Sequence, residues 1–205
     1  MATSTWRGIE IFVEIVVKTG ANSFLDIGVG NGKWGFLFRE YVDIWGERYL
    51  KHEWKAIVDG IEIYSPYIQQ HQRSVYNNIY IGDVLKIIDD LGCYDIIMAG
   101  DVLEHLHKED AIILIDKLKE RTEKVLIVSI PLGSEWLRGM VRGNKHEAHV
   151  SSWSVNELQG LGFDYYRVRM APDERRKIGS FVHFKDNRLV RMKGLRRLKK
   201  WRYFL

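Results

Sequence analysis

The 205-residue sequence predicts one α/β domain: a single doubly wound, mostly parallel sheet of seven strands, with helices on both faces and an antiparallel last strand. Short apolar, β-branched runs alternate along the chain with longer stretches of helical spacing. A glycine-rich segment directly follows the first of these runs. Hydrophobic residues make up 46% of the chain, which is enough to bury a core between a sheet and its helices.

The elements follow from local pattern. Residues 1–20 are expected to hold a helix, because the apolar segment Ile9–Val17 carries two glutamates on an amphipathic pattern. The predicted strands are Ser23–Ile27, Ala56–Ile63, Ile79–Ile81, Asp95–Ala99, Val125–Ile130, Phe163–Val168 and Ser180–Phe184. The predicted helices between them are Lys33–Ile44, Ser65–Tyr76, Lys108–Arg121 and Ser154–Leu161.

The last two strands differ from the central ones. They alternate apolar and polar residues, as strands near a sheet edge do. Only eleven residues separate them, and the polar segment Ala171–Gly179 leaves little room for a crossover helix. A connection this short predicts that the final strand is antiparallel.

The glycine segment runs from Asp26 to Gly35 and carries glycines at positions 28, 30, 32 and 35. Glycines let a backbone turn tightly and approach a nucleotide-type ligand, and the next helix presents free N–H groups to it. Gly30–Gly35 also fits the G-x-G-x-x-G pattern of dinucleotide-binding proteins, which is weak evidence alone. Asp26 discriminates between ligands: a carboxylate there suits an ammonium group and would repel a pyrophosphate. The order Asp-x-Gly-x-Gly-x-Gly resembles the first signature motif of class I S-adenosylmethionine-dependent methyltransferases.

Three further positions follow this resemblance in chain order. Glu62 ends the second predicted strand, where the resemblance implies that a carboxylate accepts from the ribose hydroxyls. Asp83 follows the third strand and is expected at the adenine, with the Val84 backbone at a ring nitrogen. The resemblance thus implies an S-adenosylmethionine site made of Asp26, Gly28, Gly30, Gly32, Glu62, Ile63, Asp83, Val84 and Asp101.

The run Asp101-Val-Leu-Glu104-His105 after the fourth strand is the most family-specific stretch. It resembles the D-x-x-E-H run of small-molecule and quinone-type methyltransferases, and the whole resemblance covers roughly residues 20 to 170. It implies that Asp101 lies near the methionine part of the cofactor, while Glu104 and His105 organise the loop.

The segment from His146 to Trp153 resembles the E-H-x-S-x-W stretch of a bacterial methyltransferase subgroup, and the resemblance implies that it lies over the methyl end of the cofactor. His149 and His146 are the candidate general bases, because imidazole titrates near neutrality; the alternative for each is a structural or surface histidine. His146, Glu147 and His149 lack a further ligand at recognisable spacing, so no metal is expected. The cations Arg138, Arg142 and Lys145 favour an anionic acceptor, or are ordinary solvated charge.

The predicted activity is methyl transfer to an oxygen or nitrogen atom of a small molecule or glycan. An NAD(P)-dependent oxidoreductase is an alternative, but its acid usually lies about 20 residues beyond the glycines. Glu62 lies 32 positions beyond Gly30, and little chain is left for a second catalytic domain. A methyltransferase-fold binding protein without activity is the non-enzymatic alternative.

The charge is unevenly placed, since residues 185–205 hold nine Lys or Arg and one Asp while the whole chain has a net charge of +4. We therefore divide the chain into a methyltransferase domain, 1–186, and a basic amphipathic tail, 187–205. The tail is expected to pack on the domain, to contact an anionic membrane surface peripherally, or to bind RNA. In the last case the alternative function is that of a tRNA or RNA methyltransferase. The lone Cys93, and the lack of an apolar stretch of about 20 residues or of a secretory signal, predict a cytoplasmic location. The oligomeric state is left open.

Overall fold

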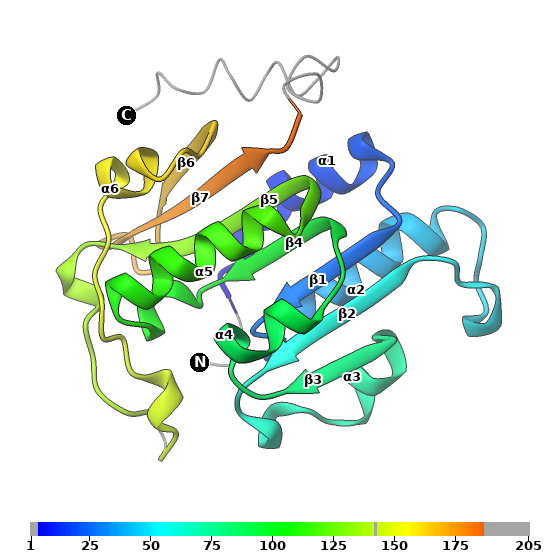
Figure 1. Ribbon diagram of the computed structural model, residues 1–205, viewed down its shortest axis with the longest axis horizontal. Coiled ribbons are helices and arrows are strands. Elements are labelled where there is room, and N and C mark those ends of the chain that lie inside the picture. Colours follow the sequence, from blue (N-terminus) through cyan, green and yellow to red (C-terminus); the bar gives the residue numbers. More distant parts are fainter. Residues whose placement is uncertain (1–3, 142, 187–205) are drawn as a thin grey trace.

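The computed structural model describes residues 4–141 and 143–186, so the predictions for the basic tail lie outside it. Seven strands form one sheet in the order β3-β2-β1-β4-β5-β7-β6 (Figure 1). The strands are β1 (Ser23–Ile27), β2 (Ile57–Glu62), β3 (Asn78–Ile81), β4 (Tyr94–Gly100), β5 (Thr122–Leu132), β6 (Tyr165–Met170) and β7 (Lys177–Phe184).

Strands β1 to β5 are parallel, whereas β7 runs antiparallel to both of its neighbours, β5 and β6. The predicted antiparallel last strand is therefore confirmed. The connection from Met170 to Lys177 is shorter than the sequence pattern indicated, because both strands extend into the predicted linker. β6 is the edge strand and β7 is its inner neighbour.

Helices cover both faces of the sheet, as predicted. On one face lie α1 (Ile9–Thr19), α2 (Lys33–Arg39) and α3 (Gln70–Val75), and on the other α4 (Val84–Ile87), α5 (Lys108–Glu120) and α6 (Val155–Gly160). In Figure 1, α5 crosses in front of the sheet and α2 lies behind it. Successive side chains of a strand point to opposite faces, so Phe24 belongs to one core while Leu25 belongs to the other.

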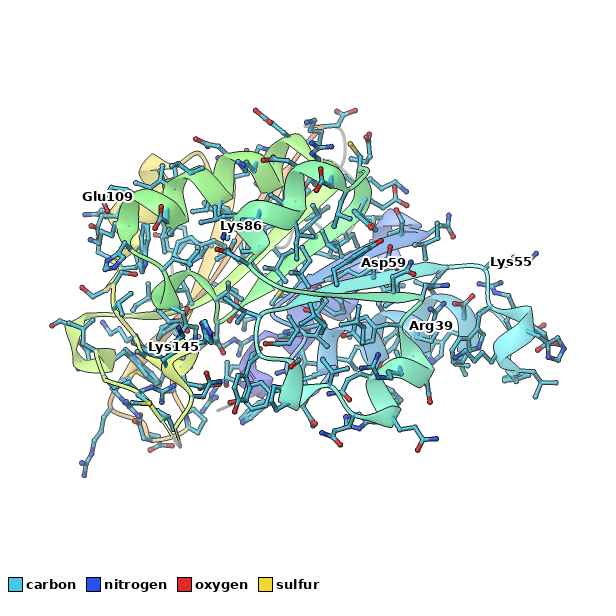
Figure 2. All side chains as sticks on the ribbon, turned by 60° about the horizontal axis from the view of Figure 1, so that its bottom comes forward. Arg39, Lys55, Asp59, Lys86, Glu109 and Lys145 are labelled. Carbon is cyan, nitrogen blue, oxygen red and sulfur yellow. The ribbon has the colours of Figure 1, made fainter. Side chains whose placement is uncertain are left out.

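The helix predicted over Lys33–Ile44 changes its geometry halfway. α2 ends at Arg39, and a π-helical turn spans Glu40–Ile44. Within this turn the buried Asp43 carboxylate accepts from Arg39 Nη1 at 2.6 Å, Arg48 Nε at 2.7 Å and the Lys55 backbone N–H at 2.9 Å. Arg39 and Lys55 lie at the opposite end of the molecule from Lys145 (Figure 2).

The single helix predicted over Ser65–Tyr76 is wrong. A 3₁₀ turn spans Ser65–Tyr67, Ile68 and Gln69 are extended, and α3 begins at Gln70. The chain leaves the helical path to bury Ile68, and the helix restarts where Gln72 Oε1 accepts from the Gln69 N–H at 2.9 Å. This break places the Tyr67 side chain at the edge of the pocket described below.

In the described part of the chain, no helix is both long and apolar enough to cross a bilayer.

Candidate active site

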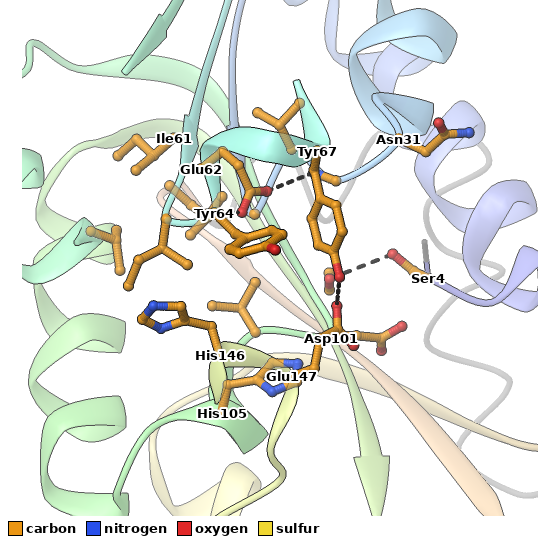
Figure 3. A pocket seen from close by; sticks show the side chains of 18 of the residues that line it. Ser4, Asn31, Ile61, Glu62, Tyr64, Tyr67, Asp101, His105, His146 and Glu147 are labelled. Atoms are coloured by element: carbon orange, nitrogen blue, oxygen red, sulfur yellow. Dashed lines mark hydrogen bonds between the residues drawn. The ribbon is translucent and has the colours of Figure 1, made fainter. Parts of the chain in front are cut away.

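A pocket of about 990 Å³, counted with its open mouth, lies beyond the carboxyl ends of β1, β2, β3 and β4 (Figure 3). In an open parallel sheet this edge is the usual place for a ligand, because the loops that follow the strands meet there. The predicted site residues on its wall are Gly28, Gly30, Glu62, Ile63, Asp83, Val84, Asp101 and His146. Asp26, Gly32 and His149 lie behind the wall.

The loop after β1 requires glycine for conformation as well as space. Gly28 has a φ of +76°, and a Cβ there would lie 2.8 Å from Val102 Cγ2. Gly32 has a φ of +78° and is the residue from which α2 starts. The backbone can therefore approach a ligand closely at the start of a helix.

Asp26 is fully buried directly behind this loop. Its Oδ2 accepts from the Tyr76 hydroxyl at 2.5 Å, and the same hydroxyl accepts from the Gly35 backbone N–H at 3.2 Å. Burial raises the pKa of Asp26 to about 8, although the Tyr76 hydrogen bond opposes this. These contacts fix the start of α2; the predicted ionic contact with a ligand ammonium stays a prediction.

Glu62 ends β2 and holds the glycine loop in place. Its Oε2 accepts from the Gly30 N–H at 2.8 Å, and its Oε1 accepts from the Tyr64 N–H at 2.9 Å. A carboxylate has about four lone-pair sites, so both oxygens can still accept from two hydroxyl groups of a ligand. Burial raises the pKa of Glu62, and these backbone hydrogen bonds counteract the shift.

Asp83 stands at the start of α4, a short helix that the sequence did not predict. Its Oδ1 accepts from the Leu85 N–H at 3.0 Å and so caps the helix. The cap orients the Val84 backbone on the wall of the pocket, next to the end of β3.

Asp101 lies beyond the end of β4 in a left-handed conformation, with a φ of +57°. Its N–H donates to the Ser129 carbonyl at 2.8 Å, while Oδ1 is buried with no hydrogen-bond partner in the described part of the chain. Burial raises the pKa of Asp101 to about 6 and lowers that of Lys33 to about 8, and attraction between the two groups opposes both shifts.

No sequence pattern predicts the wall that the N-terminal segment forms. Lys33 Nζ donates to the backbone carbonyls of Ser4 at 2.6 Å and Thr5 at 2.9 Å. Trp34 Nε1 donates to Ser4 Oγ at 3.1 Å. Residues 4 and 5 thus lie against the glycine loop, more than 25 positions away in the chain, and only the fold reveals this.

The far side of the pocket is covered by the segment that follows β5. Tyr67 donates its hydroxyl hydrogen to Glu147 Oε1 at 2.9 Å, and Asn144 Nδ2 donates to the Tyr67 hydroxyl at 3.3 Å (Figure 3). Arg138 pairs with Glu147 at 3.5 Å, so part of the positive charge predicted here is balanced within the protein. Arg142 lies outside the described residues.

The two candidate bases occupy different environments. His146 is half-buried and lines the pocket. His149 is 7% exposed, and burial, together with Arg138 and His105, lowers its pKa to about 4. His149 instead packs edge-on against His105, with ring centroids 4.9 Å apart. His105 itself lines the pocket and was expected only to organise the loop.

The strand order, the antiparallel β7 and the glycine loop at the carboxyl edge are those of the class I methyltransferase fold. Among solved structures, the magnesium protoporphyrin IX methyltransferase of Synechocystis, solved with bound SAM, has a TM-score of 0.61 and 16% identity over 88% of this chain and 79% of its own. The N-methyltransferase NodS of Bradyrhizobium japonicum has a TM-score of 0.56 and 15% identity over 85% of this chain and 93% of its own. The plantazolicin methyltransferase BamL has a TM-score of 0.53 and 14% identity over 88% of this chain and 85% of its own.

No family model matches the chain, and no curated protein matches it in sequence. The likeness to solved structures is thus a likeness of fold, and it confirms the fold that the sequence predicted.

Proposed function

We propose that this chain is an S-adenosylmethionine-dependent methyltransferase that acts on an oxygen or nitrogen atom of a small-molecule or glycan acceptor. The observation that carries the proposal is that Gly28, Glu62 and Asp83, which follow three different strands, line one pocket. Their order suits the methionine, ribose and adenine of this cofactor. The structural neighbours named as methyltransferases, one of them solved with bound SAM, support the same ligand.

The residues divide the proposed work between binding and positioning. Methyl transfer is an in-line displacement at a carbon held on a sulfonium, so alignment of donor and acceptor supplies much of the rate. Glu62 is oriented by two backbone N–H groups and accepts from the ribose hydroxyls. His146 is the group on the wall that can take a proton from an acceptor that must lose one.

Calorimetry with S-adenosylmethionine, S-adenosylhomocysteine and NADH tests the ligand. We expect both sulfur compounds to bind and NADH not to bind. Glu62→Gln weakens binding about 10- to 100-fold, because a charge-assisted hydrogen bond is worth about 1.5–3 kcal/mol. Glu120→Gln, at an exposed carboxylate at the far end of α5, is the matched control and leaves affinity unchanged. Tight NADH binding without binding of the sulfur compounds would point to an oxidoreductase instead.

Transfer is tested with methyl-labelled cofactor and fractionated cell extract. We expect a labelled small molecule or glycan, and His146→Ala lowers its rate of formation about 10²-fold or more with unchanged cofactor affinity if the acceptor must lose a proton. Cofactor binding with no labelled product in any fraction would indicate a binding protein. Label in RNA would instead identify the chain as an RNA methyltransferase.

A further inference from the structure

Three side chains with metal-binding atoms lie close together beside the part of the pocket that His105 lines. Glu104 and His105 belong to the 3₁₀ turn Leu103–His105 after β4, and His149 comes from the segment after β5. Each offers one ligand atom, and these atoms all lie within 4.8 Å of one another. The cluster differs from the trio considered from sequence, since it replaces His146 and Glu147 with the residues of the D-x-x-E-H run.

The polar atoms of this cluster are buried and unsatisfied. Glu104 is 1% exposed, and neither of its carboxylate oxygens has a hydrogen-bond partner in the described part of the chain. The same holds for Nδ1 of His149, which is 7% exposed. His105 Nε2 lies 4.0 Å from Glu104 Oε1, too far for a hydrogen bond. Buried carboxylates without partners are costly and rare, and a bound cation would satisfy these atoms.

Hydrogen bonds to the neighbouring backbone hold the two segments that carry these side chains together. His105 Nδ1 donates to the Ala148 carbonyl at 2.8 Å, which leaves Nε2 free on the side of Glu104. Histidines that bind metals commonly donate their second ring nitrogen in this way. The Glu104 carbonyl accepts from the N–H groups of Val150 at 2.8 Å and Ser151 at 3.2 Å, so the segment that carries His149 is tied to the turn.

The surrounding charge also favours a cation. Asp101 Oδ1 is a further buried carboxylate oxygen without a partner in the described part of the chain, and Asp101 is close enough to Glu104 to repel its charge. Among the described residues, Lys33 attracts Asp101, and Arg138 acts on Glu104 but pairs with Glu147.

We propose that Glu104, His105 and His149 bind a divalent transition-metal cation, of the class of Zn²⁺ or Mn²⁺, that receives a hydroxyl group of the acceptor. Two imidazoles and one carboxylate suit such ions, whereas Mg²⁺ and Ca²⁺ prefer oxygen ligands. Three protein ligands leave a coordination position open. Of the three, His105 also lines the pocket, so the proposed site adjoins it.

This inference rests on the proposed function and narrows it to O-methylation. A hydroxyl bound to the cation becomes more acidic, and its proton passes to the His146 imidazole. The oxygen then attacks the methyl carbon, the carbon–oxygen bond forms, and the carbon–sulfur bond breaks with its electron pair left on sulfur. The products are the methyl ether, the neutral thioether and one proton on histidine.

Metal binding is tested first without the methyl donor, on the full chain freed of metal with a chelator. Calorimetry with Zn²⁺ and with Mn²⁺ is expected to show one equivalent bound, and the same ions raise the unfolding temperature. His149→Ala and Glu104→Gln weaken binding about 100-fold or more, because each removes a ligand. His107→Ala replaces an exposed histidine two positions from His105 and keeps wild-type affinity. Circular dichroism verifies the fold of each variant. If His149→Ala does not fold, His149→Asn is tested in its place.

Each outcome decides one proposal. No bound ion in the wild type, or equal affinity in His149→Ala and His107→Ala, overturns the metal site. Binding of S-adenosylmethionine to the metal-free chain, measured separately, leaves the proposed methyltransferase standing in that case. Metal binding without any cofactor binding overturns the methyltransferase and leaves the metal site. If both bind, methyl transfer is expected to fall about 100-fold on chelation and to return with Zn²⁺ or Mn²⁺; unchanged transfer would refute the role in activating a hydroxyl.

Discussion

The Tyr76 hydroxyl connects the end of β1 to the start of α2, on either side of the glycine loop. It donates to Asp26 Oδ2 and accepts from the Gly35 N–H, and all three groups are buried. Gly35 lies in the first turn of α2, where N–H groups have no partner within the helix. Tyr76→Phe keeps the ring and removes only the bridge between strand and helix.

The expected loss of stability follows from the two groups that lose their partner, the Asp26 carboxylate and the Gly35 N–H. Each buried polar group left unsatisfied costs about 1–3 kcal/mol, so the variant is expected to lose about 3 kcal/mol of unfolding free energy. For a domain of this size that loss lowers the unfolding temperature by about 6–12 °C. Urea unfolding at neutral pH measures it. Tyr80→Phe is the control, because the half-buried Tyr80 hydroxyl makes no hydrogen bond within the described residues, and we expect a loss below about 0.5 kcal/mol.

The pH dependence provides a second, independent check. The pKa of Asp26 is raised from 3.8 to about 8, so its contribution to stability is full below about pH 4 and is lost as the pH rises toward 8. The Tyr76 hydrogen bond lowers this pKa, so Tyr76→Phe raises it further and the variant continues to lose stability above pH 8. The stability gap between wild type and variant therefore widens from pH 7 to pH 9.5. A loss no greater than that of Tyr80→Phe, or a gap that narrows with rising pH, would refute the reasoning.

Two further predictions concern the glycine loop and the Arg39–Asp43 ion pair at the C-terminal end of α2. Gly28→Ala combines a positive φ with a Cβ 2.8 Å from Val102, so it lowers both stability and S-adenosylmethionine affinity. Gly20→Ala, where φ is +57° and nothing lies within 4 Å of a Cβ, costs about 1 kcal/mol and leaves affinity unchanged; equal affinity losses in calorimetry would contradict this. Asp43→Asn leaves Arg39 buried without its charge partner and costs about 3–5 kcal/mol in urea unfolding at pH 7. Because its hydrogen bonds and arginine partners hold the pKa of Asp43 below 3.8, this contribution is full above about pH 4 and is lost below it, so an unchanged deficit at pH 3 would be unexpected.

The part of the site that the sequence predicted well is the part built from local signals. Gly28, Glu62 and Asp83 lie at or just beyond the ends of three strands, and parallel strands bring their carboxyl ends to one edge whatever the lengths of the helices between them. The strand pattern alone therefore placed these residues on one wall. Helix ends were predicted less well. The buried positions of Asp43 and Ile68 coincide with the departures from the predicted helices, and the local spacing of apolar residues does not reveal that burial.

Asp26 has a structural role that the sequence did not predict. The predicted contact with a ligand ammonium stays a prediction, and the structure shows the side chain fully buried against Tyr76. A strand alternates its faces, so the strand register turns Asp26 toward the core behind the loop. Tyr76, at the end of α3, has no sequence signal that pairs it with Asp26 fifty positions earlier.

The residues of the D-x-x-E-H run also have surroundings that the sequence alone does not show. Within the run alone, Glu104 is a buried carboxylate whose oxygens have no partner in the described part of the chain, a costly arrangement that packing does not explain. His149, more than forty positions later, lies beside it, because the Glu104 carbonyl accepts from the Val150 and Ser151 backbone. Sequence spacing could not join the two, since the length of α5 and β5 sets the interval and the chemistry does not. A cation shared by Glu104 and His149 would give the carboxylate its counter-charge, and it would lie beside His105, which lines the pocket.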